Sequence, residues 1–139
     1  METTGVNASA IGLKSSWTKE GLSRSIPVLT QEQRQLLVEV RDLAVSGSLI
    51  PPDRSYREHL WVFERETASV GIGHTHGLRH AYAQRRYEVL TGRKPPVPGG
   101  RSRRTMRREE RQKDDEIRRQ ISEELGHSRI SVTSTYLGT

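Results

Sequence analysis

Apolar residues recur at intervals of three and four along most of this 139-residue chain, which is the spacing of amphipathic helices. The spacing predicts helices over about residues 31–46, 53–67, 76–90 and 105–125, and a last short helix that holds Ile130, Val132 and Tyr136. The first helix carries one apolar face, made of Leu36, Leu37, Val40, Leu43 and Ala44. The chain is therefore expected to be mostly helical.

Local signals mark the ends of these helices. Thr30 followed by Gln33 is a capping box, and Gly47 with Pro51 beyond it ends the first helix. Thr75 is expected to cap the third helix, and Gly126 to end the fourth. The second helix is expected to bury Tyr56, Leu60 and Phe63.

The N-terminal part has a different pattern. Residues 1–10 are small and polar, which predicts disorder or the lead-in to a strand. Short strands are expected over 11–17 and 24–28, with Lys19 in the turn between them. The predicted fold class is therefore mainly α with a small N-terminal β-hairpin (α+β), with one domain over 11–139.

Composition narrows the classes of protein. The chain has no cysteine, which excludes disulfides, cysteine-based zinc sites and thiol catalysis. It has no long apolar run and no leader-like start, so we expect a soluble, cytoplasmic protein without a membrane partner. Hydrophobic residues make up only 32%, so the core must be small or some segments must stay unpacked.

The net charge of +6 is concentrated in one region. Residues 85–119 hold 13 Lys or Arg against 6 Asp or Glu, and the rest of the chain is close to neutral. A local basic region of this kind favours a polyanionic partner, most often nucleic acid. The alternative is a solvated helix with pairs such as Glu109 to Lys113 and Asp114 to Arg118. Within this region, 93–104 is rich in Pro, Gly and Arg and is expected to be an irregular loop.

Two groups of polar residues carry candidate chemistry. His76 and Arg79 share one helix face near an N-terminus, where free backbone N–H groups favour an anion. Alternatively, both simply face water. His74, His76 and His80 are close in sequence, but no cysteine or nearby acid completes a tetrahedral set, so no metal is expected.

The second group is Leu125-Gly126-His127-Ser128, with Tyr136 nine residues after the histidine. Taken alone, Gly126 reads as a helix C-cap and Tyr136 as a core aromatic residue with a wet hydroxyl. The two groups together, in this order, are much less likely to occur by chance than either group alone.

These residues resemble the catalytic domain of the tyrosine recombinases, the phage integrase family. The family's His-x-Leu-Arg-His helix start is matched by 76–80, and its Leu-Gly-His-Ser motif with a tyrosine nine residues after the histidine is matched by 125–128 and Tyr136. The family also has a turn Lys five residues before an Arg that leads into an Ile/Val-Pro strand. Lys19, Arg24, Ile26 and Pro27 fit that pattern, so the resemblance covers about 13–138.

The resemblance implies site-specific DNA recombination or integration through a 3′-phosphotyrosyl intermediate. It implies that Tyr136 is the nucleophile and that Arg79 and His127 donate to the phosphoryl oxygens. His76 would assist them or manage the tyrosine proton, and Lys19 would protonate the leaving 5′-oxygen. It implies no metal or cofactor, double-stranded DNA as substrate, a homotetramer on paired sites, and a bacterial or phage setting at the nucleoid.

The chain departs from the family pattern in two ways. Residues 1–18 contain no Arg, so the family's first catalytic Arg is missing, and we expect a partial catalytic domain that is inactive or very weak alone. The spacing from Arg79 to His127 is also longer than usual, which defines a basic insertion at about 92–119. Its expected DNA-backbone contacts are Arg101, Arg103, Arg104, Arg107, Arg108 and Arg111.

Three other functions remain open on the sequence. The same residues occur in type IB topoisomerases and telomere resolvases. A non-catalytic DNA-binding remnant of an integrase would also retain them. An ordinary helical interaction domain would have no affinity for DNA.

Overall fold

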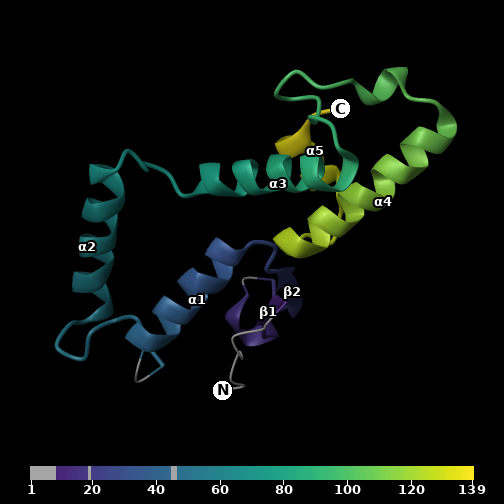
Figure 1. Cartoon of the computed structure of the whole chain (residues 1–139). Helices are drawn as coiled ribbons and strands as arrows, with labels where there is room; N and C mark the ends of the chain where they lie inside the picture. Colours follow the sequence, from purple (N-terminus) through teal and green to yellow (C-terminus); the bar gives the residue numbers. More distant parts are fainter. Residues whose placement is uncertain (1–8, 19, 45–46) are drawn as a thin grey trace. The chain divides into compact units, whose positions relative to one another are not determined.

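Five α-helices and one two-stranded antiparallel sheet make up the regular structure of the computed structural model, which describes residues 9–18, 20–44 and 47–139 (Figure 1). The predicted class, mainly α with a small sheet, is confirmed. In chain order the elements are β1 (Ala10–Leu13), β2 (Arg24–Pro27), α1 (Gln31–Leu43), α2 (Tyr56–Ser69), α3 (His76–Thr91), α4 (Arg108–Leu125) and α5 (Ile130–Leu137).

The first strand is shorter than the sequence predicts. β1 ends at Leu13, and Ser15–Trp17 forms a 3₁₀ turn closed by a hydrogen bond from the Trp17 N–H to the Lys14 carbonyl. The prediction of a strand to Trp17 is therefore wrong over this turn. β2 begins at Arg24 as expected. Residues 1–8 and the predicted turn residue Lys19 lie outside the described residues.

Capping boxes begin the first two helices. The Thr30 hydroxyl accepts from the Gln33 N–H at 3.2 Å and the Gln33 side chain accepts from the Thr30 N–H at 3.1 Å, as predicted. α2 begins three residues later than expected, because Ser55 and Glu58 form a second capping box. The Ser-x-x-Glu spacing at 55–58 is the sequence signal for this start.

The apolar residues of α2 are not buried as predicted. Tyr56, Leu60 and Phe63 are 70%, 38% and 49% exposed, and neither α1 nor α2 contains a buried residue. The prediction of their burial is wrong. Helical periodicity identifies an apolar face but not the surface that covers it.

The fourth helix and the loop before it also differ from the prediction. α4 begins at Arg108 rather than at Thr105. The predicted irregular loop over 93–104 ends in a 3₁₀ turn, Arg103–Thr105, which extends one residue beyond it. Thr75 precedes α3 as expected, but its side chain caps nothing there. Gly92 and Gly126 end α3 and α4 with φ of 71° and 79°, a left-handed conformation that favours glycine.

The chain divides into two compact units. One comprises the described part of Met1–Ile11 with Pro27–His74, and the other the described part of Gly12–Ile26 with Thr75–Thr139. In the second unit α3, α4 and α5 pack against one another around Ala83, Tyr87, Ile121, Leu125, Tyr136 and Leu137. Among the residues that the structure describes, no helix is long and apolar enough to cross a membrane.

Candidate active site

Three helices of the second unit bring an arginine, a histidine and a tyrosine into one connected group. Arg79 lies in the first turn of α3, His127 follows the end of α4, and Tyr136 lies in α5. The Arg79 Nη2 atom is 3.1 Å from the His127 Nε2 atom, which is 3.3 Å from the Tyr136 hydroxyl. Residues 79, 127 and 136, far apart in sequence, thus form a continuous chain of polar contacts.

The turn at the end of α4 fixes the position of His127. After the left-handed Gly126, the His127 N–H donates to the Ser122 carbonyl at 2.8 Å. The buried Ser122 hydroxyl reaches the carbonyls of His127 and Arg129, both at 3.1 Å. This bonding pattern resembles a Schellman ending and fixes the backbone that carries the imidazole.

The contacts of His127 define its favoured protonation state. Arg79 also donates to the Leu125 carbonyl at 2.6 Å, so its guanidinium is held beside the imidazole. Burial, then the Arg79 charge, lower the pKa of His127 below its ordinary value, opposed by Glu20. A neutral imidazole facing the Arg79 donor must accept at Nε2, so its proton is on Nδ1.

Tyr136 is a core residue whose hydroxyl reaches the site. It is only 4% exposed and belongs to the core of the second unit. Its ring centroid lies 4.7 Å from that of His80, in an edge-on arrangement, and 6.2 Å from that of His76. His80, to which the sequence assigned no role, is therefore nearer to the tyrosine ring than the exposed His76.

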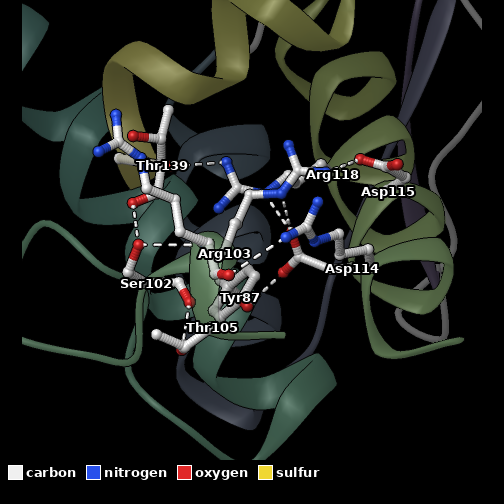
Figure 2. A network of polar contacts seen from close by, with 11 residues as sticks. Tyr87, Ser102, Arg103, Thr105, Asp114, Asp115, Arg118 and Thr139 are labelled. Carbon is white, nitrogen blue, oxygen red and sulfur yellow. Dashed lines mark hydrogen bonds and ion pairs between the residues drawn. The ribbon is translucent and has the colours of Figure 1, made fainter. Parts of the chain in front are cut away.

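A buried polar network joins the basic segment before α4, and α4 itself, to the end of α5. Figure 2 shows Asp114 of α4 at the centre of a polar network, where it accepts from the Tyr87 hydroxyl and pairs with Arg118 at 2.6 Å and Arg103 at 3.0 Å. Arg118 also donates to the Gly138 carbonyl at 2.9 Å. The predicted Asp114–Arg118 pair is thus confirmed, but both side chains are fully buried rather than solvated.

Two further hydrogen bonds reach the same end of the chain. The Val97 N–H donates to the Leu137 carbonyl at 3.0 Å, and the Ser102 hydroxyl donates to the Thr139 carbonyl at 3.2 Å. Because these carbonyls lie one and three residues after Tyr136, the predicted insertion helps to fix the C-terminal end of the tyrosine helix.

A second buried ion pair joins α3 to α4. Glu124 accepts a bifurcated hydrogen bond from the Arg86 Nε–H and one bond from its Nη2 atom, at 2.9–3.1 Å. It accepts a further one from the Tyr82 hydroxyl at 2.7 Å. Burial and the bond to Glu124 raise the pKa of Tyr82. Tyr82 therefore stays protonated and serves as a hydrogen-bond donor.

The six arginines predicted to contact DNA fall into two groups. Arg101 pairs with Glu110 at 2.8 Å, and Arg103 pairs with Asp114 and Asp115. The other four are exposed: Arg104, Arg107, Arg108 and Arg111. Arg108 and Arg111 line an open groove of about 590 Å³ together with Arg119. Four of the six are therefore available to a ligand.

Within the described ranges, no group of three or more His, Asp or Glu side chains is placed to hold a metal ion. No protein-family model, curated protein or solved structure matches the chain.

Proposed function

We propose that this chain is a partial tyrosine-recombinase catalytic domain, with Tyr136 as the nucleophile, which breaks and rejoins DNA strands in site-specific recombination as part of a complete protein and is inactive or very weak alone. The observation that carries the proposal is the contact chain from Arg79 through His127 to the Tyr136 hydroxyl. It joins a permanent cation, an imidazole of lowered pKa and a phenol, which are the groups that in-line attack on a phosphodiester requires.

The geometry suggests how the proton and the charge are handled. The Tyr136 hydroxyl donates its proton to the His127 Nε2 atom as its oxygen attacks phosphorus, and the bond to the 5′-oxygen breaks. The resulting imidazolium and Arg79 then donate to the phosphoryl oxygens, each worth about 2–4 kcal/mol in the transition state. A proton passes to the 5′-oxygen, the role that the resemblance implies for Lys19. Rejoining reverses these steps, so the phosphodiester energy is conserved.

Burial of Tyr136 imposes a conformational step. The Tyr136 residue is only 4% exposed, so we expect α5 or its neighbours to move when the hydroxyl meets a scissile phosphate. The proposed substrate is double-stranded DNA, and the proposed assembly is a homotetramer on paired sites at the nucleoid of a bacterial or phage-infected cell. DNA binding would therefore both expose the tyrosine and deliver its target.

Covalent capture tests the proposal. The full chain is incubated with a pool of nicked duplexes of randomised sequence, in which the cleaved end diffuses away and traps the adduct. We expect a weak but SDS-stable protein–DNA adduct, which peptide mapping locates at Tyr136. Tyr136→Phe should abolish it, whereas the control Tyr56→Phe removes an exposed phenol outside the site and should retain it. Adduct that persists in Tyr136→Phe would refute the nucleophile assignment.

The second candidate is a non-catalytic DNA-binding remnant. The observation that favours it is the complete packing of Tyr136 in the core, which a structural tyrosine would also show. This candidate predicts salt-dependent binding of duplex DNA with no adduct in the same assay. Relaxation of supercoiled DNA without a partner site would instead indicate a topoisomerase-like activity.

A further inference from the structure

Arg24 packs directly against the turn that presents His127. It is the first residue of β2, and a Cβ added at Gly126 would overlap its guanidinium. Only glycine therefore permits this approach, in addition to its left-handed φ of 79°. Arg24 matched a family position in the sequence, but nothing there assigned it a role.

Among the residues that the structure describes, no carboxylate neutralises the guanidinium of Arg24. Arg86, Arg101, Arg103 and Arg118 each pair with a carboxylate, whereas no carboxylate among the residues that the structure describes lies within 4.0 Å of Arg24. Its Nε atom is buried and has no hydrogen-bond acceptor among those described residues. A buried N–H without an acceptor is unfavourable unless a ligand satisfies it.

An open groove of about 800 Å³ lies beside this guanidinium. Arg24, Ser25, Ser122, His127 and Ser128 contribute to its lining. Two acidic residues also line it, but Glu124 is neutralised by Arg86 and Glu123 is exposed. Arg119 lines the groove as well, so a ligand there would meet hydroxyls, an imidazole and the two cations Arg24 and Arg119.

We propose that Arg24 is a second anion-binding arginine of the site, in addition to Arg79, and that it holds a phosphate group of the DNA against His127 in this groove. This inference rests on the proposed function and adds a residue to it. Burial lowers the pKa of His127 most, and the charges of Arg79 and Arg24 lower it further, so both cations act on this imidazole. A planar guanidinium matches two phosphate oxygens with two parallel N–H donors, which Lys cannot do.

Phosphate binding to the full chain tests the assignment. Inorganic phosphate is titrated at constant ionic strength while the His127 imidazole nitrogens are followed by NMR. We expect Arg24→Gln to weaken phosphate binding at His127 by about tenfold or more, the usual effect of losing a charged hydrogen bond. The matched control Arg85→Gln removes the same charge from an exposed position of α3 and should change the affinity less than about twofold.

A second variant of Arg24 controls for misfolding. Arg24→Lys keeps the charge without the planar fork, and should lose part of the affinity while thermal unfolding stays near that of the wild type. Unchanged affinity in both Arg24 variants, equal loss in Arg85→Gln, or no response of His127 in the wild type would each overturn the inference. Covalent capture at Tyr136 is a separate readout: capture without Arg24-dependent phosphate binding would leave the proposed function standing and remove only this role.

Discussion

At the scale of single residues, the ionisation of His127 is the most accessible property of the site. Burial and the Arg79 charge lower its pKa, so NMR titration should give a value below about 6.5 and an Nδ1–H tautomer. Arg79→Gln should raise this pKa because it removes the nearer cation. Arg85→Gln, which removes a charge elsewhere on α3, should leave it unchanged. A fall in the pKa in Arg79→Gln would contradict the assigned geometry.

The same shift links stability to pH. The folded state binds the His127 proton less readily than the unfolded chain does. His127 therefore contributes to the free energy of unfolding above its unfolded pKa of about 6.5, and this contribution is lost as the pH falls through the folded pKa. The free energy of unfolding should therefore fall less between neutral and mildly acidic pH in His127→Gln than in the wild type. An equal or steeper fall of the free energy of unfolding in His127→Gln would exclude His127 as a source of this pH dependence.

Gly126 should be the least replaceable glycine of the site. Gly126→Ala forces a side chain into a left-handed backbone and into the Arg24 guanidinium, and should cost about 1–2 kcal/mol or more. Gly77 is the matched control, because it lies in the first turn of α3 with open space around it. Gly77→Ala should be neutral or stabilise the protein by up to about 1 kcal/mol in urea unfolding. Equal effects would contradict the close approach of Arg24.

At the scale of elements, the buried charges of α4 should dominate stability. Asp114→Asn leaves Arg118 buried without its partner carboxylate, which typically costs about 3–5 kcal/mol. Asp42→Asn breaks an exposed pair with Arg41 and should cost less than about 1 kcal/mol. Both are measured by chemical unfolding. A small effect of Asp114→Asn would mean that the network in Figure 2 does not hold α4 to the end of α5.

The helices were predictable from the sequence because their signals are local. The capping box at Thr30 and the glycine at Gly126 act over a few residues, and both are present in the structure. Burial was not predictable in the same way. Tyr56 sits on a periodic apolar face yet is exposed, whereas Asp114 sits in a charged run yet is buried, because tertiary partners decide both. The contacts of Arg24 and His80 depend on packing between distant segments for the same reason.

At the scale of the whole molecule, the basic region should act on DNA through only part of its arginines. Each exposed arginine that neutralises a phosphate adds about 0.9 to the slope of log affinity against log salt concentration. Arg108 and Arg111 line an open groove, so their joint replacement by Gln should lower the slope for duplex DNA by roughly 2. Arg101 and Arg103 are already paired with carboxylates, so their replacement should change the slope little and instead lower stability. Fluorescence anisotropy over a series of salt concentrations measures both slopes. Equal losses in the two double variants would show that internal pairing does not decide which arginines meet DNA, and an unchanged slope in both would exclude this region as the DNA-binding surface.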